Sequence, residues 1–208
     1  MGQTLAGRPL VGFDLETTGT DPFEARIVTA SLCAPGAPDR TWLADPGVDI
    51  PTGASDVHGI TTAHAREHGR PARDVAEEVA SALEDLWSSG HIVVIYNASY
   101  DLRVVHSELD RHGLPTLDIG TVLDPLVLWR KAEKYRKGKK TLSEAVTRFG
   151  VVLSNAHESA ADATAAVQVT ERLAELVPWQ SWSHDQAMQL QEEWSRELSL
   201  IHISEPTR

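Results

Sequence analysis

The stretch PLVGFDLETTG at residues 9–19 alternates between apolar residues and small or charged ones, which is typical of a β-strand. One face of this strand carries its large apolar side chains, namely Val11, Phe13 and Leu15. Asp14 and Glu16 lie together on the other face, because residues two apart in a strand point the same way. Adjacent carboxylates raise each other's pKa unless a cation lies between them, and their oxygens suit Mg²⁺ or Mn²⁺. The pair therefore indicates a metal site, although two solvated acids would show the same spacing.

Periodicity along the rest of the chain predicts further strands and helices. Strands are expected at 26–33, 40–44 and 91–96, with a shorter one near 116–119. Helices are expected between Pro71 and Gly90, from about residue 98 to Gly113, from Thr141 to Gly150, over about 159–177, and from Ser183 onward. The helix over 159–177 should bury Leu173 and Leu176. Three strands followed by alternating helices and strands give an α/β domain around a mixed sheet.

Two further motifs place polar residues at the starts of predicted helices. Asn97-Ala98-Ser99-Tyr100-Asp101 follows the most apolar predicted strand, the place where α/β folds present reactive groups. Asn97 or Ser99 could instead cap that helix, with Asp101 favouring its dipole. His157 precedes Asp162 by five residues, and on one continuous helix the two would diverge by about 140°. They can share a site only if His157 lies on the loop before the helix, and the alternative is a surface or capping histidine.

In this order and spacing, the three motifs resemble the DEDDh family of 3′→5′ exonucleases. The resemblance extends from about Leu10 to Leu176, which is most of the chain. It rests on the string FDLETTG at 13–19, on Asn-Ala-x-x-Asp ending at Asp101, and on His-x-x-x-x-Asp ending at Asp162. The segment VHGIT at 57–61 matches a His-Gly-Ile element that lies near the bound nucleotide in the family. The segment DPL at 124–126 resembles the family's Asp-Thr-Leu element, with Pro in place of Thr.

This resemblance implies a ribonuclease-H-like α/β fold, with a mixed five-stranded sheet and helices on both faces. It also implies two ions of Mg²⁺ or Mn²⁺ held by the carboxylates of the motifs, which are Asp14, Glu16, Asp101 and Asp162. Asp14 would contact both ions, and Asp101 would act mostly through water. His157 would be the general base, a role that suits an imidazole near neutral pH. The expected reaction is hydrolysis of phosphodiester bonds from the 3′ end of DNA, or of RNA, with release of nucleoside 5′-monophosphates.

Contacts to a single-stranded nucleic acid 3′ end are expected from residues around these motifs. The candidates are Thr17, Thr18, His58, Asn97, Arg136 and Lys137. The last two belong to a basic segment, residues 129–140, which has seven Lys or Arg residues and one Glu. A net charge of −11 argues against a protein that coats nucleic acid broadly, but not against an enzyme that holds a few nucleotides through metal ions. The basic segment is therefore either a phosphate contact or a solvated loop.

The length of 208 residues fits one exonuclease domain at 1–178 followed by a helical appendage at 179–199. Residues 200–208 resemble a translated sequencing adapter, so we expect a non-native tail there. The appendage is rich in tryptophan and is either a surface that docks a DNA polymerase, as in a proofreading subunit, or a helix packed on its own domain. A third hypothesis is a silent module that binds 3′ ends without turnover, and the complete set of carboxylates argues against it.

The chain lacks the marks of a membrane or exported protein. No stretch approaches the roughly 20 apolar residues of a membrane span, and the first residues lack a signal-peptide core. We therefore expect a cytoplasmic protein with no membrane partner. Cys33 ends an apolar run, which predicts a buried core residue.

Overall fold

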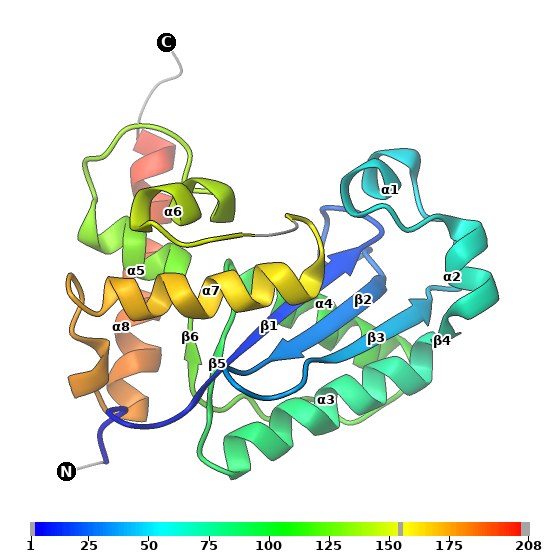
Figure 1. Cartoon of the computed structure of the whole chain (residues 1–208), viewed down its shortest axis with the longest axis horizontal. Helices are drawn as coiled ribbons and strands as arrows, with labels where there is room; N and C mark the ends of the chain where they lie inside the picture. The colour runs from blue at the N-terminus through cyan, green and yellow to red at the C-terminus, as the bar shows by residue number, and fades with distance from the viewer. Residues whose placement is uncertain (1–2, 154–155, 205–208) are drawn as a thin grey trace.

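The central sheet of the protein is mixed, with strands in the order β4-β3-β2-β1-β5-β6 (Figure 1). The computed structural model describes residues 3–153 and 156–204, with the backbone alone for 198–204. The strands are β1 Leu10–Thr17, β2 Ile27–Cys33, β3 Arg40–Asp45, β4 Arg70–Pro71, β5 Ile92–Val94 and β6 Val122–Leu123. β1 pairs antiparallel with β2, and β2 with β3, whereas β5 and β6 continue the sheet in parallel with β1. The predicted mixed sheet is confirmed.

Two details of the predicted sheet are wrong. The described residues form six strands instead of five, because Arg70–Pro71 adds a short parallel pairing with Ala44 and Asp45 of β3. Two residues are too few for alternation to show in the sequence. The strand expected near 116–119 lies at Val122–Leu123, where the backbone pairs with β5. The apolar residues at 117 and 119 pack into the core without joining the sheet.

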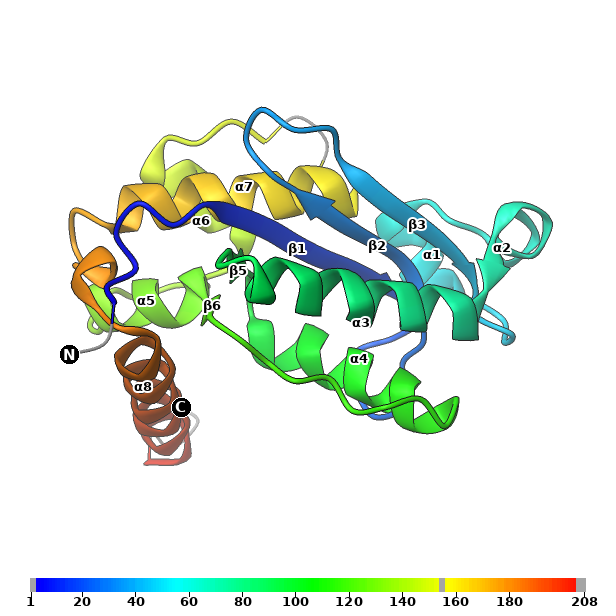
Figure 2. The same ribbon diagram turned by 90° about the horizontal axis from the view of Figure 1, so that it is seen from below.

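Helices cover both faces of the sheet, as predicted (Figure 2). They are α1 Thr52–His58, α2 Thr62–His68, α3 Ala72–Ser88, α4 Ala98–Arg111, α5 Pro125–Ala132, α6 Leu142–Phe149, α7 Ser159–Leu173 and α8 His184–Ser204, with a short 3-10 helix at Trp179–Ser181. α3 and α4 lie against the face of β1 that carries Phe13, and α7 lies across the opposite face. α7 stops before residue 177, in a turn that leaves Leu176 52% exposed, so its predicted burial is wrong.

The C-terminal segment packs on its own domain. Leu5 N–H donates to the carbonyl of Trp182 at 2.8 Å, and the Trp182 ring meets that of Trp194 edge-on at 5.6 Å. Trp179 and Trp182 are buried in a second core formed with residues of α5 and α7. These contacts fit the expectation of a helix packed on its own domain. In the part of the chain that the structure describes, no helix is long and apolar enough to cross a membrane.

Candidate active site

Three elements bring the predicted catalytic residues to one edge of the sheet. Asp14 and Glu16 lie towards the carboxyl end of β1. Asp101 is in the first turn of α4, which follows β5, the parallel neighbour of β1. Asp162 is in the first turn of α7, which lies across β1. Because parallel strands end at the same edge of a sheet, Asp101 meets Asp14 there, and α7 brings Asp162 to them by crossing β1.

Gly12 allows α7 to approach β1 closely enough to deliver its carboxylate. A Cβ at this position would lie 2.1 Å from the backbone oxygen of Ala163, so no larger residue fits without moving α7. Gly12 shares the face of β1 that carries Asp14 and Glu16, and Ala163 directly follows Asp162. Sequence reasoning did not use Gly12, although a glycine inside a strand is a known signal of close backbone approach.

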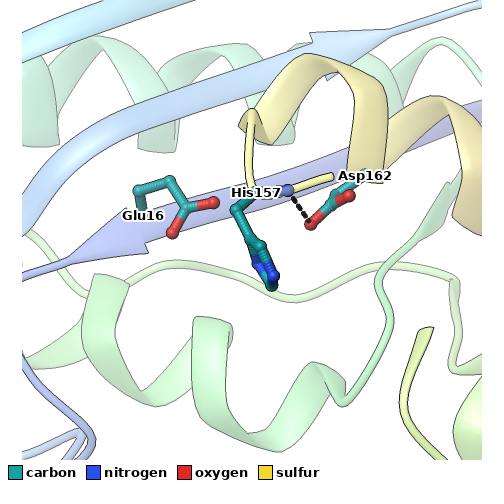
Figure 3. A group of neighbouring side chains, drawn as sticks. All are labelled: Glu16, His157 and Asp162. Atoms are coloured by element: carbon teal, nitrogen blue, oxygen red, sulfur yellow. Dashed lines mark hydrogen bonds between the residues drawn. The ribbon is translucent and has the colours of Figure 1, made fainter. Parts of the chain in front are cut away.

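His157 lies on the loop before α7, as its spacing from Asp162 required. Its φ of 67° is rare for a residue other than glycine and turns the chain into the helix, which begins at Ser159. The His157 N–H donates to Oδ2 of Asp162 at 3.3 Å (Figure 3). Ligand atoms of Glu16, His157 and Asp162 all lie within 4.8 Å of one another. His157 therefore lies close enough to Glu16 and Asp162 to share a site with them, and its side chain is exposed.

The carboxyl groups of the site are buried close together, and their pKa values are raised. Burial, followed by the charges of Asp101, Asp162 and Glu16, raises the pKa of Asp14 well above its ordinary value. Burial and then the charge of Asp162 raise the pKa of Glu16 to about 7. Burial also raises the pKa of Asp101 and of Asp162, and backbone hydrogen bonds partly oppose it in each case. Like charges held together out of water favour protonation unless a cation neutralises them.

The residues present fit a divalent cation. All four carboxylates offer the hard oxygen ligands that Mg²⁺ and Mn²⁺ prefer. Among the described residues, Oδ1 of Asp162 is buried and accepts no hydrogen bond. A buried carboxylate oxygen without a partner is costly, and a metal ion at that position would satisfy it.

Asn97 starts α4 in a left-handed conformation, with φ 67° and ψ 47°, and its side chain makes no capping hydrogen bond. The backbone N–H groups of Asn97 and Ala98 donate instead to the two oxygens of Asp124, at 3.0 and 2.9 Å. The alternative that Asn97 caps the helix with its side chain is therefore wrong. Asp124 takes that role from 27 residues further along the chain, where sequence spacing gave no sign of it.

Thr17, Thr18 and His58 lie beside the carboxylates, but their side chains are partly engaged within the protein. The Thr17 hydroxyl is 2.6 Å from the hydroxyl of Tyr100, and the Thr18 hydroxyl accepts from the N–H of Arg26 at 2.9 Å. Burial lowers the pKa of His58, and the Thr17 backbone opposes this effect, which places His58 near the end of β1. The predicted position of all three near the site is consistent with these contacts.

The basic segment at 129–140 is anchored next to the start of α4. The hydroxyl of Tyr96, which precedes Asn97, donates to the Lys140 carbonyl at 2.8 Å. Arg136 is 3.7 Å from Glu133 and, like Lys140, lies over the Trp129 ring. These two side chains are therefore partly committed to the fold, whereas those of Lys137 and Lys139 are exposed.

Comparison with known proteins gives a family and a fold. A family model with the description Exonuclease matches residues 11–170. A sequence relative, the protein called DNA polymerase III PolC-type of Streptococcus sanguinis, is 28% identical over 165 residues, which cover 77% of this chain and 11% of the polymerase. The chain thus spans about a tenth of that relative's length.

Two solved structures share this fold over most of the chain. Exonuclease I of E. coli in complex with a dA16 oligonucleotide superposes with a TM-score of 0.69 at 19% identity, over 82% of this chain and 42% of that one. The zinc ion bound form of the E. coli exonuclease I complex with single-stranded DNA gives a TM-score of 0.68 at 20% identity, over 82% and 41%. The predicted ribonuclease-H-like fold is confirmed by this likeness, apart from the additional strand.

Proposed function

Because the chain belongs to the RNase T exonuclease family, we propose that it removes nucleotides from DNA in the 3′→5′ direction and releases nucleoside 5′-monophosphates. The predicted membership of the DEDDh, DnaQ-like group is thereby confirmed. The observation that carries the proposal is the convergence of the carboxyl groups of Asp14, Glu16, Asp101 and Asp162, with His157 close to Glu16 and Asp162. RNA is the alternative substrate, and contacts to the 2′-hydroxyl would distinguish it from DNA.

The four carboxylates would hold two ions of Mg²⁺ or Mn²⁺. Bound there, the ions supply positive charge that activates the attacking water and stabilises the leaving oxygen. The raised pKa of Glu16 and the unpartnered oxygen of Asp162 support this assignment, because both are relieved by a cation.

His157 acts as the general base. Its exposed side chain at the entrance of α7 is accessible to water, and the bond from its N–H to Asp162 fixes the loop that carries it. The imidazole accepts a proton from the attacking water as the water oxygen bonds to phosphorus and the P–O3′ bond breaks. The 3′-oxygen leaves with the electron pair of that bond and takes a proton from solvent.

The substrate is the 3′ end of a single strand. Thr17 and Thr18 would offer backbone groups to the terminal nucleotide, and His58 would pack against its sugar or base. Asn97 is exposed beside the first turn of α4 and would contact the same nucleotide. Phosphates behind the scissile bond would meet the basic segment, chiefly through Lys137, with Arg136 sharing its charge with Glu133.

Digestion of 5′-labelled oligonucleotides tests this function. Single-stranded DNA should give a descending ladder with Mg²⁺ or Mn²⁺, no products with EDTA, and no products when the 3′ end carries a phosphate. Matched RNA and duplex DNA in parallel tubes decide the preferred substrate. The Asp14→Asn variant is the control for a contaminating nuclease. Cutting of closed circular single strands would show an endonuclease and contradict the proposal.

A second candidate function is proofreading beside a DNA polymerase, which the PolC-type relative favours.

We assign the exonuclease domain to residues 1–178, the helical appendage to 179–199 and a non-native tail to 200–208. We expect the protein in the cytoplasm. The helix α8 continues to Ser204, and residues 205–208 lie outside the described part.

Because the tryptophans of the appendage pack inward, a polymerase that docks on the appendage would have to contact other residues. Pull-down with a polymerase subunit tests this candidate.

A further inference from the structure

One buried carboxylate caps two helices at the active site. The first N–H groups of a helix have no partner within it and need an acceptor. Oδ1 of Asp124 accepts from Asn97 at 3.0 Å and from Leu126 in α5 at 2.9 Å, and Oδ2 accepts from Ala98 at 2.9 Å. Asp101 is three residues after Ala98, so the position of its carboxyl group is set by how α4 begins.

The left-handed residue at this junction makes the contact more demanding. Asn97 has φ 67°, a left-handed conformation that is uncommon outside glycine, although asparagine adopts it more readily than most residues. Asp124 accepts from the N–H of Asn97 itself and from the N–H of the next residue, Ala98. Loss of one carboxylate oxygen would leave a buried N–H of Ala98 without an acceptor and free the turn to relax.

Asp124 is in turn held by the C-terminal helix. Its N–H donates to Oε1 of Gln191 at 2.7 Å, across 67 residues of chain. The Nε2 of Gln191 donates to the carbonyl of Val122 in β6 at 3.0 Å and to that of Ala187 in α8 at 2.8 Å. The Gln191 side chain is 9% exposed, and α8 lies beside β6 and α5 (Figure 2).

We propose that Asp124 and Gln191 are positioning residues for the metal site, because they join α8 to the start of α4 and so fix Asp101. This Asp124–Gln191 bridge rests on the proposed function, in which Asp101 helps to hold the ions. Through this bridge, α8 of the helical appendage contributes to the metal site of the exonuclease domain. Mutation of a residue that orients a metal ligand without binding the ion itself commonly lowers metal affinity by about 10–100-fold.

Two variants test the bridge. Asp124→Asn keeps the size of the side chain but places an NH₂ group where one N–H needs an acceptor. Gln191→Met keeps the length and removes all three hydrogen bonds of that side chain. The matched control is Gln189→Met, on the same helix, where the side chain is exposed and bonds only to Glu193 among the described contacts.

Calorimetric titration with Mn²⁺ and hydrolysis of the nitrophenyl ester of thymidine monophosphate give separate readouts. Both bridge variants should bind Mn²⁺ about 10–100-fold more weakly and lose kcat at fixed Mn²⁺. Excess Mn²⁺ should restore part of kcat. The Gln189→Met control should match the wild type in each measurement.

Circular dichroism at the assay temperature separates positioning from stability. Variants that are folded and bind Mn²⁺ as tightly as wild type would overturn the proposal and leave Asp124 as a helix cap alone. The same holds if both variants are unfolded, since the bridge would then serve folding only. If wild-type protein neither binds Mn²⁺ nor cleaves the ester, the proposed function itself fails, which is a distinguishable result.

Discussion

Raising the pH in the absence of divalent ions should destabilise this protein, and Glu16 should account for much of the effect. Burial and Asp162 raise its pKa from 4.5 to about 7 in the folded state. A group with a raised folded pKa binds its proton more tightly when the protein is folded. Its contribution to the free energy of unfolding is therefore fully present below pH 4.5 and is lost as the pH rises through 7.

The size of this effect follows from the same shift. Each pH unit between the folded and unfolded pKa corresponds to about 1.4 kcal/mol. Between pH 5 and pH 8, Glu16 should therefore cost about 2 kcal/mol, after allowance for solvent screening of its partly exposed carboxyl group. In a domain of this size, 1 kcal/mol moves the thermal midpoint by about 2–4 °C. The midpoint should fall by about 4–8 °C, and Asp14 and Asp101, whose pKa values are also raised, act in the same direction.

Thermal unfolding followed by circular dichroism at pH 5 and pH 8 measures this fall, first in EDTA and then with Mn²⁺. An ion present at 100 times its Kd stabilises the folded state by about 2.7 kcal/mol, so Mn²⁺ at pH 8 should offset most of the loss. Glu16→Gln is the control, because an amide does not titrate and the fall should shrink by the Glu16 share. A midpoint in EDTA that is equal or higher at pH 8, or an unchanged fall in the variant, would refute the reasoning.

Three further predictions concern the base, the helix contact and the basic segment. His157→Ala should lower kcat by about 10²–10⁴-fold in steady-state kinetics, with little change in nucleotide binding measured by titration with thymidine monophosphate. Equal activity of the variant and the wild type at pH 7 would remove the histidine from the mechanism. Gly12→Ala should lower the free energy of unfolding, measured in urea, by about 1–3 kcal/mol, because Ala163 and the rest of α7 must move. The same movement should weaken Mn²⁺ binding, and an unchanged Mn²⁺ affinity would count against the contact. Replacing Lys137 and Lys139 with Gln should raise KM for long oligonucleotides, and the slope of log KM against log salt concentration should fall by about one per lost phosphate contact. The small ester should be cleaved normally. A solvated loop predicts no change for either substrate.

The sequence alone determined the parts of the site that depend on local periodicity. Side chains two apart in a strand share a face, so the pairing of Asp14 with Glu16 follows from their spacing. Five residues do not return to the same side of a helix, so His157 could share a site with Asp162 only from the loop before α7, and it lies there because α7 begins at Ser159. The order of the motifs then indicated the family and its fold.

Only the tertiary structure decided how these parts are held together. The contacts of Asp124 with Asn97 and with Gln191 join positions 27 and 67 residues apart, and no periodicity links them. The last strand formed at Val122–Leu123 because β5 offers its hydrogen-bonding partners there, and not where apolar residues suggested it. Gly12 likewise acquires its role from the backbone of Ala163, which folding places against it. Such contacts depend on the packing of whole elements, whereas a local pattern records only what neighbouring residues can do.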